Sequence, residues 1–147
     1  MSSDSDGSQK VLSPFSHSNC IACSQQGLLQ LVFYTRDQHS VYAKVLFDKY
    51  WQGYQGLLHG GIIAMILDSA LAHCTFLCSP NSVTASLNLR YHRPVPISQF
   101  GEVRARCIKS KCGLSQLSAE LVVAGDIYAS ATASFMRKSA LGINNQC

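Results

Sequence analysis

One apolar run, residues 62–78, constrains the fold of this chain more than any other stretch. It is shorter than the ~20 apolar residues that a membrane-spanning helix needs, and it carries Asp68 and His73. Apolar residues lie on nearly all sides of the helix that this run predicts, so other parts of the chain must cover most of it. We therefore expect a buried core helix.

Alternating apolar and polar residues, typical of β-strands, follow the helix. Strands are predicted at residues 29–34 and 40–48 before the helix, and at 82–92, 101–109, 114–125 and 126–137 after it. Long consecutive strands pair readily as antiparallel neighbours. The apolar helix must also be buried, and a sheet can pack over it. The order predicts an α+β fold in which a curved antiparallel sheet wraps around one long central helix. In the first strand after the helix, Thr84 and Arg90 fall on the polar face.

Length and composition favour one domain with a partner copy. The chain has 147 residues, of which 47% are hydrophobic and 14% charged. We expect a domain over residues 13–138, a disordered Ser/Asp-rich tail over 1–12, and a C-terminal tail over 139–147. So few charges suggest a surface buried against another subunit.

Charge and cysteine usage limit the classes of partner. A net charge of +4 is too small for a nucleic-acid-binding arm, so we expect no nucleic-acid partner. The apolar run is too short to span a membrane and carries Asp68 and His73, so we expect no membrane partner. The polar first ten residues lack the apolar region of a signal peptide. Seven scattered cysteines indicate reduced thiols rather than a disulfide framework. Together these features predict a cytoplasmic protein.

Asp68 is the one carboxylate in the apolar helix. An ionised Asp there is costly unless it is paired, hydrogen-bonded or near water, so it is either a structural anchor or a functional group. Gly60 and Gly61 begin the helix, where unpaired N–H groups and the positive end of the dipole suit an oxyanion. A glycine pair alone would indicate only a flexible turn.

The spacing of these residues predicts a site made by two chains. Gly60 and Asp68 lie about 12 Å apart along a helix, at ~1.5 Å per residue. This is too far for both to contact one reacting carbonyl. Two antiparallel helices around a two-fold axis would bring the start of each near the middle of the other. We therefore expect a homodimer with two equivalent sites.

The segments "GYQGLL", "HGGIIAMILD" and "VTASLNLRYHRPVP" resemble the PaaI-like acyl-CoA thioesterases of the hotdog-fold superfamily. The resemblance covers residues 20–136, and "CIACSQQGLLQLVF" resembles the opening of some bacterial members. It implies a dimer with a continuous sheet, often paired into a tetramer, and hydrolysis of a fatty or aromatic acyl thioester of coenzyme A. No cofactor is implied.

The resemblance assigns roles to five residues. Asp68 matches the catalytic carboxylate, a general base or nucleophile. The Gly60 N–H matches the oxyanion donor, and Gly61 allows close approach. His59 would position the substrate carbonyl or the helix start, although a turn His would serve the backbone alone. Thr84 would hold the attacking water, although an ordinary strand Thr is nearly as compatible with the pattern.

One position departs from the family. Many members carry an Asn six residues before the His, where this chain has Gly53. Gln52 or Gln55 could supply the missing amide. Gly53 also favours the alternative function, a non-enzymatic hotdog protein that binds acyl-CoA or a related ligand. A hotdog dehydratase fits less well, because it would need a different His/Asp arrangement.

Basic residues and cysteines give two further expectations. Arg90 and Arg93 are predicted to bind the phosphates of coenzyme A, although a solvated strand face explains such residues equally well. Cys20 and Cys23 have the spacing of half a zinc site, with His17 nearby, but no second pair follows. We therefore expect no metal, with buried or loop thiols as the simpler interpretation.

Overall fold

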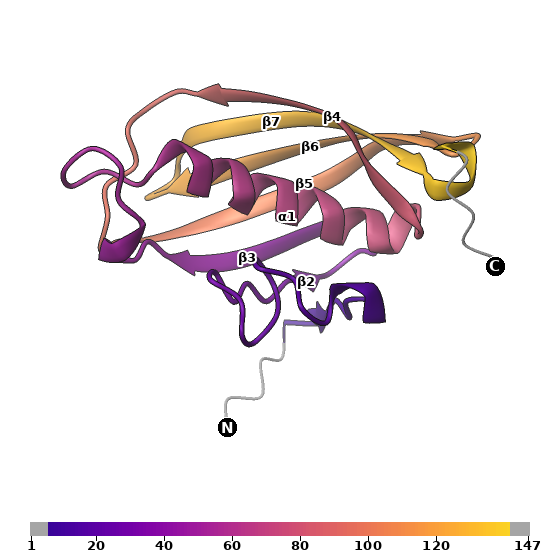
Figure 1. Cartoon of the computed structure of the whole chain (residues 1–147), viewed down its shortest axis with the longest axis horizontal. Coiled ribbons are helices and arrows are strands. Elements are labelled where there is room, and N and C mark those ends of the chain that lie inside the picture. The colour runs from indigo at the N-terminus through magenta and orange to yellow at the C-terminus, as the bar shows by residue number, and fades with distance from the viewer. Residues whose placement is uncertain (1–5, 142–147) are drawn as a thin grey trace.

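A single helix crosses the inner face of a curved antiparallel sheet in the computed structural model, which describes residues 6–141 (Figure 1). This confirms the predicted fold class. The helix is α1 (Gly60–Cys78), and the seven-stranded sheet has the order β1-β2-β3-β5-β6-β7-β4. The strands are β1 (Gln9–Lys10), β2 (Tyr34–Thr35), β3 (Ser40–Leu46), β4 (Ser82–Tyr91), β5 (Phe100–Lys111), β6 (Leu114–Val123) and β7 (Asp126–Arg137). Three short 3-10 helices are η1 (Phe15–His17), η2 (Lys49–Trp51) and η3 (Lys138–Leu141).

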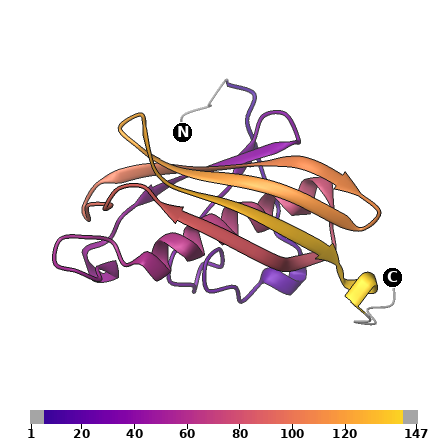
Figure 2. The same ribbon diagram turned by 90° about the horizontal axis from the view of Figure 1, so that it is seen from above.

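The core lies between α1 and the sheet. Ile66, Leu67 and Leu71 of the helix are completely buried, as are Leu117 and Leu121 of β6. By length and composition α1 could also cross a membrane. Its packing against the sheet instead makes it the expected core helix, and Figure 2 shows the sheet curving over it.

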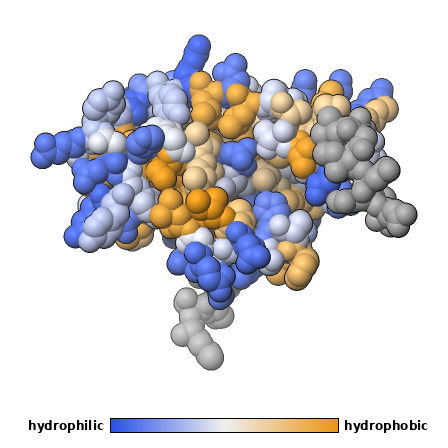
Figure 3. All heavy atoms as spheres, in the orientation of Figure 1, coloured by the Kyte–Doolittle hydropathy of each residue, from blue (hydrophilic) through white to orange (hydrophobic). Residues whose placement is uncertain are grey.

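One stripe of α1 is left uncovered by the sheet. Gly61 is exposed, and Met65, Asp68, Ala72 and Phe76 are each half-buried. Residues three and four apart lie on the same side of a helix, so these five form one continuous stripe. Figure 3 shows apolar side chains gathered on the face over which α1 lies. This stripe, whose Phe76 end contacts the His17 ring, and the neighbouring edge strand β4 face away from the rest of the sheet.

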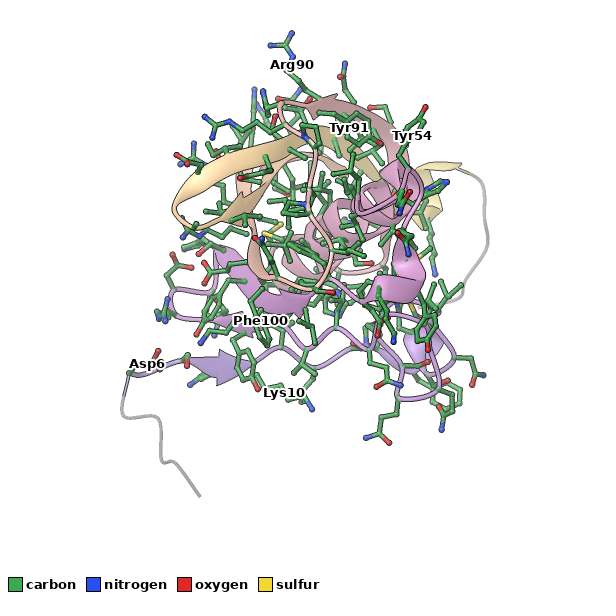
Figure 4. All side chains as sticks on the ribbon, turned by 90° about the vertical axis from the view of Figure 1, so that its left-hand side faces the viewer. Asp6, Lys10, Tyr54, Arg90, Tyr91 and Phe100 are labelled. Carbon is green, nitrogen blue, oxygen red and sulfur yellow. The ribbon has the colours of Figure 1, made fainter. Side chains whose placement is uncertain are left out.

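A bulge in β4 corrects the predicted faces of that strand. Thr84 pairs with Phe135 and Ser86 with Ser134, so the register shifts between them. Directly opposed residues point to the same side of a sheet, which puts Thr84 on the helix side with the buried Phe135. Arg90 pairs with Ser130 beyond the bulge and points outward (Figure 4). The prediction that Thr84 and Arg90 share a face is therefore wrong.

The N-terminal segment is irregular where a strand was predicted. Leu29, Leu31 and Phe33 are buried in alternation, but only Tyr34–Thr35 forms a strand. The N–H groups of Leu29 and Leu31 donate to carbonyls of the preceding loop, those of Ile21 and Ala22. The alternation thus reports burial against α1 and the core rather than a sheet ladder.

The N-terminal tail is shorter than predicted within the described residues. Gln9–Lys10 pairs with β2, and Val11 is buried, although the tail was expected to extend to residue 12. Residues 1–5 and 142–147 lie outside the described residues. The second of these ranges contains most of the expected C-terminal tail, residues 139–147. The other domain limits stay predictions.

Candidate active site

The start of α1 leaves one backbone donor free. His59 is the N-cap, and its Nδ1 accepts a hydrogen bond of 2.8 Å from the Gly61 N–H. The N–H groups of Ile62 and Ile63 donate to the His59 carbonyl at 3.0 and 3.1 Å. Among the hydrogen bonds of residues 6–141, the Gly60 N–H makes none. It therefore remains available to a ligand at the positive end of the helix dipole.

Tyr91 braces this helix start. Its hydroxyl donates a hydrogen bond of 2.9 Å to the Gly60 carbonyl. A Cβ added to Gly60 would lie 3.6 Å from the Tyr91 hydroxyl oxygen, an ordinary contact. Figure 4 shows Tyr91 at the end of β4 beside the helix. Nothing in the sequence pattern indicated this contact of Tyr91 with Gly60.

The loop before the helix explains the glycine at position 53. A Cβ on Gly53 would lie 3.2 Å from both Cα and Cδ2 of His59, closer than most Cβ contacts in proteins. The N–H of His59 donates to the Trp51 carbonyl at 2.8 Å, which holds the two segments together. An Asn side chain would therefore require His59 to shift. Gly53 and the position of the His59 ring are coupled.

Gln52 does not supply the missing amide. Its Oε1 accepts a hydrogen bond of 2.9 Å from the Gly56 N–H, and its Nε2 donates to the Lys49 carbonyl at 3.0 Å. Both ends of the amide therefore hold the loop, which corrects the prediction for Gln52. Gln55 is exposed in the same loop.

Asp68 lies half-buried in the middle of α1 and meets β4. The Thr84 hydroxyl donates a hydrogen bond of 3.1 Å to its Oδ1. Burial raises the pKa of Asp68 above its usual range, while the Thr84 hydrogen bond and the charge of His17 oppose the rise. A carboxylate with a raised pKa is a stronger base than one in water, which suits proton abstraction.

The predicted site residues form two separate groups in one chain. His59, Gly60 and Gly61 lie together at the helix start, and Asp68 lies with Thr84 near its middle. Because both groups belong to the same helix, about 12 Å separates them. Within one chain the two groups are therefore too far apart to contact the same reacting atom.

The two arginines lie away from the Asp68 carboxylate. Arg90 points outward from the sheet. Arg93 pairs with Asp126 at 3.3 Å and lies 5.7 Å from the centre of the Tyr128 ring. Among residues 6–141, the group with metal-ligand spacing is His17, Cys20 and Cys23, and it does not include Asp68.

Comparison with known sequences matches the segment that contains both groups. The family model described as Thioesterase superfamily matches residues 55–123. The acyl-coenzyme A thioesterase THEM4 of Bos taurus is 29% identical over 118 residues, which cover 76% of this chain and 46% of the bovine protein. The acyl-coenzyme A thioesterase THEM5 of Homo sapiens is 28% identical over 81 residues, or 55% of this chain and 33% of the human protein. The chain thus spans less than half the length of these relatives.

Solved structures share the fold. Zebrafish thioesterase superfamily member 2 aligns with a TM-score of 0.71 at 16% identity, covering 82% of this chain and 93% of that chain. A mutant of the phenylacetic acid degradation protein PaaI from Thermus thermophilus aligns with a TM-score of 0.63 at 23% identity, covering 67% and 84%. At these identities the likeness establishes the fold alone.

Proposed function

We propose that this chain, which matches the thioesterase superfamily model over residues 55–123 and has the hotdog fold, hydrolyses an acyl-coenzyme A thioester to a free acid and coenzyme A. One observation carries the proposal. The half-buried Asp68, hydrogen-bonded to Thr84, lies on the same helix whose first residue, Gly60, keeps a free N–H. A base and an oxyanion donor are the two groups that thioester hydrolysis requires.

A homodimer unites these two groups. The uncovered stripe of α1 contains Asp68, and β4 is an edge strand of the sheet with most of its residues exposed. Pairing of β4 with its copy would continue the sheet and set the two helices antiparallel. Asp68 would then face Gly60 of the partner subunit. Two such dimers joined through other faces would form the expected tetramer.

In the proposed reaction, Asp68 takes a proton from a water molecule as the water oxygen attacks the thioester carbonyl. The tetrahedral intermediate carries an oxyanion, which accepts a hydrogen bond from the N–H of Gly60 of the partner subunit. The intermediate then collapses and breaks the carbon–sulfur bond. The departing thiolate takes the proton from Asp68, so the products are the acid and coenzyme A.

The rest of the substrate would contact less specialised surfaces. The apolar stripe that flanks Asp68, at Met65, Ala72 and Phe76, would hold a fatty or aromatic acyl group. Arg90 and Arg93 remain the proposed ligands of the coenzyme A phosphates, and a solvent-exposed pair such as Arg93–Asp126 is weak enough to yield to a phosphate. The cytoplasmic location also stays a prediction.

A non-enzymatic acyl-CoA binder is the second candidate. It would use the helix start without needing Asp68. Gly53 favours it, because the amide that many family members have there is absent and Gln52 is engaged elsewhere. This function predicts ligand binding without turnover.

Thiol release from a panel of acyl-CoAs with short, long and aromatic acyl groups tests the proposal. Wild type is compared with Asp68→Asn, which keeps the shape of the side chain and an acceptor for Thr84. We expect hydrolysis to fall ~10²–10⁴-fold, the usual contribution of a general base. Glu120→Gln, on the outer face of the sheet, is the matched control and should keep full activity. Equal turnover in Asp68→Asn and wild type would overturn the role of Asp68, and binding of acyl-CoA without any turnover would favour the second candidate.

A further inference from the structure

The N-terminal segment brings a histidine to the Cys-x-x-Cys pair. One ligand atom from each of His17, Cys20 and Cys23 lies within 4.8 Å of the other two. The sequence predicted no metal because no second Cys pair follows. The fold supplies the third ligand by ending η1 at His17 just before the cysteine turn. None of the three takes part in the proposed hydrolysis.

The spacing fits a tetrahedral ion. The distance from Cys23 Sγ to His17 Nδ1 is 3.8 Å. Zn–S bonds of ~2.3 Å and Zn–N bonds of ~2.0–2.1 Å at tetrahedral angles separate such ligand atoms by about 3.5–3.8 Å. Small side-chain rotations would therefore close the cluster on a metal. All three residues are half-buried, so the ligands are ordered by packing and remain reachable.

The surrounding backbone supports the cysteine turn. The Ala22 N–H donates to Cys20 Sγ at 3.4 Å, the type of hydrogen bond that stabilises a thiolate ligand. The N–H of Cys20 donates to the His17 carbonyl at 3.1 Å, which holds the third ligand beside the pair. A Cβ on Gly27 would lie 2.5 Å from the Ile21 carbonyl oxygen, so only glycine lets the chain cross this turn.

We propose that His17, Cys20 and Cys23 bind a zinc ion, with the fourth position open to water. Thiolate and imidazole ligands select zinc among the abundant divalent ions. The Ser13 hydroxyl borders the cluster. Its oxygen lies 3.9 Å from Cys23 Sγ and 3.1 Å from Nε2 of His73.

The ion would brace the N-terminal segment where it packs against the central helix. The His17 ring packs edge-on against Phe76 of α1, with 4.8 Å between ring centres. Both cysteines belong to the loop that follows η1, and Figure 2 shows this N-terminal segment close to α1. Coordination would therefore join the η1 turn to that loop, and its free energy would add to the stability of the segment.

Metal analysis of the full chain, purified under reducing conditions, tests the site. We expect one zinc per chain by elemental analysis. We also expect cobalt(II) in its place to give the intense visible bands of a tetrahedral site and thiolate charge-transfer absorption. Cys23→Ser should lower the zinc affinity by at least ~100-fold, because even outer-shell changes cost 10–100-fold. Cys112→Ser, which removes an exposed thiol, should keep both the zinc and the spectrum.

His17→Ala gives a second variant in case Cys23→Ser does not fold. It keeps both thiols, and we expect the cobalt spectrum to lose intensity and the zinc affinity to fall. Folded wild type that binds no more zinc than Cys23→Ser would overturn the site. So would a cobalt spectrum without thiolate absorption, or a Cys20–Cys23 disulfide that persists under the reducing conditions.

Discussion

The Thr84 hydroxyl donates a hydrogen bond of 3.1 Å to the Asp68 carboxylate, and so links the edge strand β4 to the middle of α1. This contact exists because the bulge after Thr84 turns its side chain toward the helix. The residue expected to hold the attacking water instead contacts the proposed base directly. It therefore acts on the basicity of Asp68 as well as on its orientation.

Thr84→Val should move the acidic limb of the pH profile. Hydrolysis needs the ionised Asp68, whose pKa burial already raises and the Thr84 hydrogen bond lowers. Removing that hydrogen bond takes away an interaction that lowers the pKa, so the acidic limb of the profile should move to higher pH. The measurement is kcat/KM against pH, with Thr84→Ser as the control that keeps the donor. A lower kcat with an unmoved acidic limb would instead support a role for Thr84 in holding the water.

Gly60→Pro tests the oxyanion donor. Proline is tolerated at the first helical position and removes only an N–H that has no helical partner. The extended backbone of His59, with φ −62° and ψ 133°, suits the residue before a proline. We expect a folded protein whose kcat falls ~10²–10³-fold, the cost of one lost oxyanion donor. Gly60→Ala keeps the N–H and meets Tyr91 at an ordinary distance, so it is the matched control. Wild-type kcat in Gly60→Pro would exclude this donor.

Mixed dimers test whether the two halves come from different chains. A dimer of one Gly60→Pro chain and one Asp68→Asn chain holds one intact site if each site draws on both chains, and none if each site lies within one chain. Refolding equal amounts of the two inactive variants together should therefore restore roughly a quarter of the wild-type activity per chain. The control mixes each variant with itself. If mass measurements show that subunits have exchanged but no activity returns, both groups of a site must lie in the same chain.

His73 should make stability depend on pH. It is 2% exposed, stacks on Phe33 with 4.2 Å between ring centres, and its Nδ1–H donates to the Ser69 carbonyl at 2.8 Å. Burial lowers its pKa to about 4, so the unfolded chain takes up a proton more readily than the folded chain as the pH falls from 6.5. The free energy of unfolding should therefore decrease between pH 6.5 and 4, by up to about 3 kcal/mol.

Denaturant titrations of wild type and His73→Phe between pH 7 and 4 measure this effect. The variant keeps an aromatic ring against Phe33 and has no proton to gain. The stability difference between the two proteins should shift in favour of the variant as the pH falls. A difference that is constant with pH would show that His73 does not titrate in this range.

The sequence alone determined the features that depend on local pattern. The apolar run at residues 62–78 predicted α1 as a core helix, because a helix with apolar residues on nearly all sides must be buried. Alternation predicted β3 and the four long strands after the helix, because a half-buried sheet requires it. The spacing of Gly60 and Asp68 along one helix also followed from the sequence, since helical rise is constant. These features, with the resembling motifs, were enough for the fold class and for the two halves of the candidate site.

Only the tertiary structure decided which distant residues meet. One extra residue in β4 reverses the side on which Thr84 lies, and no local pattern encodes a bulge reliably. The contact of Tyr91 with Gly60, and the engagement of Gln52 within its loop, depend on how the chain returns to the helix start. The burial of Leu29 likewise comes from packing without a sheet ladder. The periodicity of a sequence indicates which residues are buried. The register of the strands and the path of the chain determine which residues they pack against.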